Sequence, residues 1–252
     1  EWTTWEAFAD AMETVRVNGE AMGYYSYGSG QGSIRMFNAA LAATPAGAEM
    51  LKGPLTADAI NSEEFADAFR TVATLDQQNG SANSSVNAND FAADFNNGLS
   101  AVFINGVWGA SQFAGSDNFV SCIYAISSAN TGLYVANDLS DAQKELALEF
   151  IKYMTSEEVQ SRYFLETSSN PINENVDIQK LAQESGDPTA LKLAEACDKC
   201  NKADTIVLAI DVCWGNDVGG ALQNKFAECA VAGTDIEAKL AELQAELTAL
   251  IG

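Results

Sequence analysis

Apolar residues recur every three or four positions along most of the chain, which is the spacing of an amphipathic helix. The clearest stripe lies near the C-terminus and consists of Ile236, Leu240, Leu243, Leu247 and Leu250. Thr234 and Glu237 have the spacing of a capping box at its start. The same periodicity predicts helices over residues 3–18, 33–43, 61–75, 90–98, 141–154, 157–164, 177–200, 216–231 and 235–251, with an interruption at Gly186-Asp187-Pro188.

Short runs with strand character lie between these helices. They cover residues 21–27, 101–104, 119–126, 131–135 and 205–210. The glycine-rich stretch Gly28–Gly32 predicts a loop after the first run, and the polar stretch 76–89 predicts another. Helices therefore dominate, short strands are interspersed, and no regular strand–helix–strand repetition is visible. This pattern indicates the α/β class.

Charge and composition weigh against several classes of function. The chain has 13 Lys and Arg against 35 Asp and Glu, a net charge of −22, which disfavours nucleic acid and anionic lipid as partners. It contains no histidine, which removes Ser-His-Asp and Cys-His catalysis and weighs against an enzyme. No apolar run reaches the ~18 residues of a membrane span. The chain opens without a basic or apolar leader, so we expect a mature form or a fragment.

The cysteines do not identify a site. There are five of them, at positions 122, 197, 200, 213 and 229, and an odd number cannot pair fully within one chain. Cys197 and Cys200 form a lone CxxC inside a helical pattern. They could be structural, form a local disulfide, or belong to a redox or metal site whose further ligands the sequence does not supply. We expect no metal and no cofactor.

Five segments carry a resemblance to a known family. They are Thr4-Trp5-Glu6-Ala7-Phe8, the stretch from Phe95 to Trp108, the stretch from Ala147 to Gln160, Ser169-Asn170-Pro171, and the stretch from Trp214 to Leu240. In this order and spacing they resemble the helix starts, strand–loop and turns of the family 1 extracellular solute-binding proteins of ABC importers, the maltose-binding-protein type. The resemblance covers about residues 3–250.

The resemblance implies a periplasmic-binding-protein-like fold of class II, with a helix-rich lobe and a short-stranded mixed sheet. It assigns residues 1–118 together with 172–252 to the second, C-terminal lobe, and 119–171 to a returning part of the first, N-terminal lobe. In that family, residues before the Thr-Trp-Glu helix build most of the first lobe, so we expect that lobe to be largely missing here.

The family also implies a function and a location. We expect an extracytoplasmic protein, either a cell-surface lipoprotein or periplasmic, that acts as a monomer. It would bind a small polar ligand, a mono- or oligosaccharide, in the cleft between lobes and deliver it to the permease of an ABC transporter. We do not expect an enzyme.

Two tryptophans match family positions that stack on sugar. Trp108 follows the Ile104-Asn105-Gly106 turn at the end of a strand, and Trp214 precedes a helix. Aromatic faces suit the flat apolar C–H faces of a sugar ring. For each residue the alternative is a core tryptophan, which for Trp214 would pack against the terminal helices.

Polar candidates complete the expected site. Asn216 and Asp217 begin the helix after Trp214, where they could bond sugar hydroxyls or cap the helix. Tyr27 directly precedes the glycine-rich stretch, and Gln31 lies within it. Both side chains could form hydrogen bonds with sugar hydroxyls. That stretch lacks the Lys-Ser/Thr that a phosphate-binding loop requires, so we do not expect it to hold phosphate.

Three other functions fit parts of the pattern. The same fold could bind a peptide, a polyamine or another small polar solute, and the acidic balance would suit a cation. A glycosidase would need two facing carboxylates, and no pair among the 35 acids is selected by the sequence. A cell-surface interaction module would present aromatic patches away from any cleft.

Overall fold

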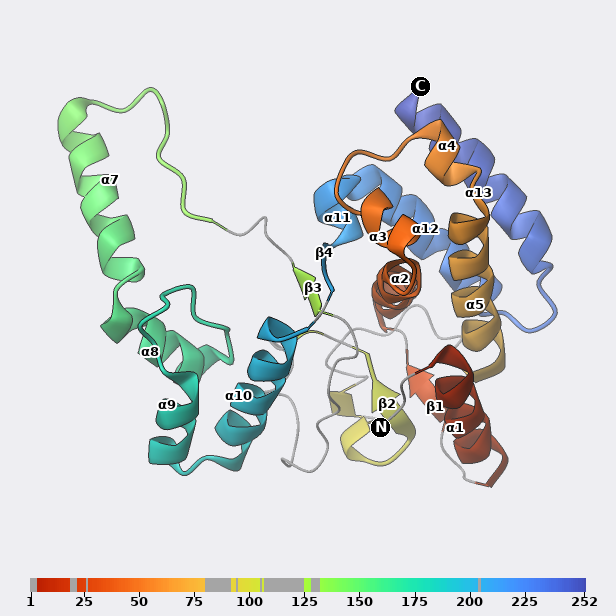
Figure 1. Cartoon of the computed structure of the whole chain (residues 1–252), viewed down its shortest axis with the longest axis horizontal. Helices are drawn as coiled ribbons and strands as arrows, with labels where there is room; N and C mark the ends of the chain where they lie inside the picture. Colours follow the sequence, from red (N-terminus) through yellow and green to blue (C-terminus); the bar gives the residue numbers. More distant parts are fainter. Residues whose placement is uncertain are drawn as a thin grey trace. The chain divides into compact units, whose positions relative to one another are not determined.

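The computed structural model describes residues 4–18, 22–25, 27–79, 92–93, 95–104, 106, 125–127, 132–203 and 205–252, and the chain divides into two compact units (Figure 1). The larger unit comprises Glu1–Asn105, Ile123–Ala129 and Ala203–Gly252. The smaller unit comprises Gly106–Cys122 and Asn130–Lys202.

The larger unit combines packed helices with two short parallel sheets. Its helices are α1 (Trp5–Asn18), α2 (Tyr27–Ala42), α3 (Pro45–Met50), α4 (Ala57–Ile60), α5 (Glu63–Asn79), α11 (Ile210–Cys213), α12 (Asn216–Cys229) and α13 (Ile236–Ile251). Strand β1 (Met22–Tyr25) pairs in parallel with β2 (Ser100–Phe103), and β3 (Ala125–Ser127) pairs in parallel with β4 (Ile206–Leu208). Both described sheets are thus parallel pairs, where the expectation was a mixed sheet.

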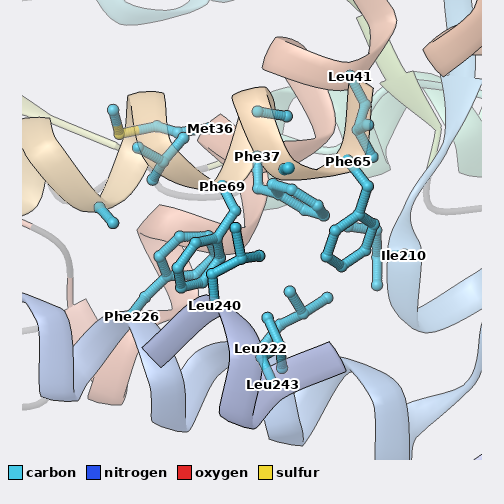
Figure 2. Packing of buried hydrophobic residues seen from close by; sticks show 14 of the residues in the cluster. Met36, Phe37, Leu41, Phe65, Phe69, Ile210, Leu222, Phe226, Leu240 and Leu243 are labelled. Carbon is cyan, nitrogen blue, oxygen red and sulfur yellow. The ribbon is translucent and has the colours of Figure 1, made fainter. Parts of the chain in front are cut away.

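The core of the larger unit is rich in aromatic rings and lies between α2, α5, α12 and α13 (Figure 2). Phe37 of α2 packs edge-on against Phe65 of α5, with ring centroids 5.1 Å apart. Phe69 of α5 stacks on Phe226 of α12 at 4.9 Å. The α13 stripe covers these rings with the buried side chains Leu240, Leu243 and Leu247. Burying each such side chain stabilises the fold by roughly 1.5–3 kcal/mol.

The smaller unit is a set of capped helices with little core. It contains α7 (Asp141–Met154), α8 (Glu157–Thr167), α9 (Ile178–Ser185) and α10 (Pro188–Asn201). Serine or aspartate side chains bond the first-turn amides of all four helices. Phe164, Leu193 and Cys197 are buried together with three alanines, whereas α7 has no buried residue.

The periodicity predicted most of the described helices correctly. The Gly28–Gly32 loop is wrong, because the helix backbone of α2 begins at Tyr27. The apolar face that continues through Ile34 and Phe37 favours the helix more than the glycines, at ~1 kcal/mol each, oppose it. Residues 76–79 are helical rather than loop, since Leu75 and Asn79 stay buried at the end of α5.

Three smaller expectations also change. Residues 132–135 are irregular rather than a strand. The cap of α13 is Asp235, which accepts from the Ala238 amide, because the Thr234 hydroxyl donates to the Glu228 carbonyl instead. Residues 172–202 cluster with the helices that precede them rather than with 203–252. The assignment of these segments to lobes stays a prediction.

Candidate functional site

Two strands of the larger unit, one from each parallel pair, lead into the segments that hold predicted ligand residues. Strand β1 ends at Tyr25 and leads into α2 at Tyr27, while β4 ends at Leu208 and leads into α11 at Ile210. Ligands of parallel α/β sheets bind outside the carboxyl ends of the strands. The segments that follow β1 and β4 are therefore the candidate site.

A buried asparagine fixes the segment that follows β4. Asn38 of α2 is fully buried, and its side-chain Nδ2 donates to the Leu208 carbonyl at 2.9 Å. Its Oδ1 accepts from the Ile210 amide at 3.1 Å. One side chain thus satisfies a donor and an acceptor that the chain leaves open where strand turns into helix. The sequence analysis missed Asn38, although a polar residue inside an apolar helix face was the available signal.

Trp214 ends this segment inside the aromatic core. Its ring stacks on Phe65 with centroids 6.3 Å apart and packs edge-on against Phe37 at 6.5 Å. The indole Nε1–H donates to the Met50 carbonyl at 3.2 Å, and only 8% of the residue is exposed. Trp214 thus lies in the core, as in the alternative, but these contacts join it to α2, α3 and α5, where the expectation was the terminal helices. Contact between Trp214 and a ligand stays a prediction.

The first turn of α12 presents polar side chains to solvent. Gly215 is the N-cap with φ of +91°, a backbone conformation that side chains rarely adopt. Asn216 and Asp217 are both exposed, and no side chain caps the helix. Neither residue therefore has the capping role that was the alternative to hydroxyl binding, and both remain accessible.

An ion pair joins α2 to the same segment. Arg35 Nη1 donates to Asp211 Oδ1 at 2.8 Å, and Nη2 donates to Oδ2 at 3.4 Å. The hydrogen bond and charge of this guanidinium hold the pKa of Asp211 below its ordinary value. The two side chains remain 30% and 34% exposed. Sequence reasoning missed this pair because 176 positions separate its members.

The remaining predicted residues have a less complete description. Positions 27 and 31 are four residues apart in the first two turns of α2, so they share one face of that helix. Trp108 lies outside the described residues. The structure thus joins Trp214, Asn216 and Asp217 in one segment, and places Tyr27 and Gln31 together on another helix.

The part of the chain that the structure describes contains no group of three or more Cys, Asp or Glu residues that could hold a metal ion. Burial raises the pKa of the Cys213 thiol, beside the site, to about 11, which disfavours the reactive thiolate. None of the described helices is long and apolar enough to cross a membrane.

Comparison with known proteins identifies the family of the chain. No curated protein matches the sequence. A solute-binding protein of Streptococcus pneumoniae, solved in complex with the blood group A-trisaccharide, is 37% identical with a TM-score of 0.88. The match covers 99% of this chain and 64% of that protein, so the chain spans less than two thirds of its length.

More distant structures share the fold. A chitin oligosaccharide binding protein is 17% identical with a TM-score of 0.70, and the match covers 97% of this chain and 63% of that protein. A solute-binding protein in complex with raffinose is 15% identical with a TM-score of 0.66, and the match covers 100% of this chain and 67% of that protein. These likenesses confirm the predicted periplasmic-binding-protein-like fold. Since the family profile for bacterial extracellular solute-binding protein matches residues 1–189, the chain belongs to the bacterial extracellular solute-binding proteins.

Proposed function

We propose that this chain is part of a carbohydrate-binding protein that delivers a mono- or oligosaccharide to the permease of an ABC importer. The observation that carries the proposal is the 37% identity, over 99% of the chain, to a protein whose structure holds a trisaccharide. The distant likenesses support the fold alone. The proposal places the protein outside the cytoplasm, as a lipoprotein or in the periplasm, and gives it no catalytic role and no cofactor.

The proposed site combines aromatic surface with groups that bond hydroxyls. A sugar hydroxyl both donates and accepts, so amide, carboxylate and phenol side chains suit it. We assign hydroxyl contacts to Asn216 and Asp217, whose exposure supports this role, and to Tyr27 and Gln31. Trp108 is the proposed stacking residue. Trp214 borders the site, where its burial supports a role in holding α12 in place.

The proposed protein has two lobes, of which this chain supplies the second and part of the first. We keep the assignment of residues 1–118 with 172–252 to the second lobe, and of 119–171 to a returning part of the first. The exposed apolar side chains of α7 support the second half of this assignment. Leu146, Phe150 and Tyr153 lie on one helix face and are 72%, 53% and 56% exposed, as expected of a helix that packs on further chain.

Calorimetric titration of the two-lobed protein that contains this chain tests the proposal. The panel contains blood group A trisaccharide, chitotriose, xylotriose and raffinose, with a tripeptide and spermidine as ligands of other classes. We expect measurable heat from at least one saccharide and none from the other two ligands. Heat from spermidine or the tripeptide alone would overturn the carbohydrate assignment in favour of another solute on the same fold.

A matched pair of variants locates the binding. Asp217→Ala and Asp58→Ala each remove an exposed acid from the first turn of a helix, but Asp58 belongs to α4, which packs on α5 and α13. We expect Asp217→Ala to weaken binding about tenfold, which corresponds to about 1.4 kcal/mol. Asp58→Ala should leave affinity unchanged. Equal affinities of the two variants would argue against a site at the start of α12.

A further inference from the structure

Arg35 and Asp211 form an ion pair in which, among the described residues, some hydrogen-bond donors of the guanidinium and some acceptor sites of the carboxylate are not used. A guanidinium carries five N–H donors. Two of those on Arg35 go to the Asp211 carboxylate, at 2.8 and 3.4 Å. Each carboxylate oxygen accepts one of these bonds and has room for another. Both side chains are about one third exposed, so a ligand can reach them.

Three elements place this pair at the candidate site. Asp211 lies three residues beyond the carboxyl end of β4, and Asn38 fixes the backbone on either side of Ala209. Gly219 of α12 faces Asp211 so closely that a Cβ added there would lie 3.8 Å from the Asp211 Cβ. The pair is therefore held between α2, α11 and the first turns of α12, which also present Asn216 and Asp217.

A second arginine of the larger unit shows what a purely structural pairing looks like. Arg70 of α5 bonds three carboxylates, those of Glu63, Asp67 and Glu237, and so ties α5 to α13. Its side chain is 35% exposed, close to the 30% of Arg35. Among the described residues Arg35 instead has one carboxylate partner, Asp211, which lies just beyond the end of β4, where ligands bind.

We propose that Arg35 and Asp211 are a specificity-determining pair that binds two neighbouring hydroxyls of a neutral sugar and rejects acidic ones. One hydroxyl accepts from a guanidinium N–H while the other donates to the carboxylate, and such linked bonds strengthen one another. Since Asp211 already compensates the charge of Arg35, an anionic ligand finds no free cation there. The exposed carboxylate of Asp217 adds repulsion. This inference rests on the proposed carbohydrate function.

The test compares Arg35→Gln, Asp211→Asn and the control Arg70→Gln, each made in the two-lobed protein that contains this chain, with the unsubstituted protein. Affinity is measured by calorimetry for the tightest-binding trisaccharide of the panel (blood group A trisaccharide, chitotriose, xylotriose or raffinose) and for the acidic 3′-sialyllactose. Melting temperature is measured in parallel. We expect Arg35→Gln to bind the neutral sugar at least tenfold more weakly, whereas Arg70→Gln melts earlier but binds within twofold of the unsubstituted protein.

The isosteric variant Asp211→Asn tests selectivity. It leaves Arg35 uncompensated, so the preference for the neutral sugar over 3′-sialyllactose should fall at least tenfold. If Arg35→Gln and Asp211→Asn only lower the melting temperature, as Arg70→Gln does, and keep affinity and selectivity within twofold, the pair is structural and the inference is wrong while the carbohydrate function stands. If the unsubstituted two-lobed protein binds no saccharide of the panel, the proposed function itself fails.

Discussion

Replacing Asn38 by alanine is expected to destabilise the larger unit strongly and to loosen the candidate site. The change removes the Asn38 partner of the buried Ile210 amide and of the part-buried Leu208 carbonyl. An unsatisfied buried group costs about 1–3 kcal/mol and a part-buried one less, so the pair costs about 3 kcal/mol of unfolding free energy. For a chain of this size that corresponds to a fall in melting temperature of roughly 10 °C.

Urea denaturation followed by circular dichroism measures this loss. The matched control is Asn61→Ala, because the Asn61 side chain also donates to a backbone carbonyl, that of Ala57, but on the exposed surface. Substitution there should cost less than about 0.5 kcal/mol. If Asn38→Ala is no more destabilising than Asn61→Ala, the two hydrogen bonds of Asn38 do not hold the end of β4 and do not position the site.

Side-chain burial and ion pairing elsewhere in the chain lead to three more predictions. Phe226→Ala should cost about 3–5 kcal/mol because its ring is fully buried against Phe69, whereas Leu146→Ala, at a side chain 72% exposed, should change stability by less than about 0.5 kcal/mol in the same urea assay. The Cys229 thiol, whose pKa burial raises to about 12, should react with a disulfide reagent at pH 8 far more slowly in the native than in the unfolded chain; equal rates would contradict its burial. Because its arginine partner lowers the folded-state pKa of Asp211, the stability difference between the unsubstituted chain and Asp211→Asn should be present above about pH 4 and shrink as pH falls further, and a difference independent of pH would exclude this coupling.

Helix periodicity could be predicted from the sequence because its signal is local. The stripe that includes Leu240, Leu243 and Leu247 is visible within one helix, and the structure buries all three side chains as expected. The start of α2 could not be predicted in this way, since glycine at positions 28, 30 and 32 favours a loop locally. Only the packing of the rest of the helix decides that this stretch is helical.

The polar framework of the site could not be predicted for the opposite reason. Arg35 and Asp211 are 176 positions apart, and Asn38 bonds groups 170 and 172 positions away, so no spacing rule connects them. The side chain of Trp214 suits a sugar face or a core equally well, because both environments favour a large apolar ring with one donor. Its burial becomes evident only when Phe37 and Phe65 are brought beside it.

The most direct test of carbohydrate binding at the strand ends is a two-dimensional amide NMR titration of the isotope-labelled two-lobed protein that contains this chain with blood group A trisaccharide. We expect the changes in amide chemical shift to concentrate at residues 209–219 and in the first turns of α2, while the amides of α13 stay unchanged. Shifts confined to elements away from these two segments, or no shifts at millimolar sugar while chitotriose, xylotriose and raffinose are equally silent, would contradict this expectation.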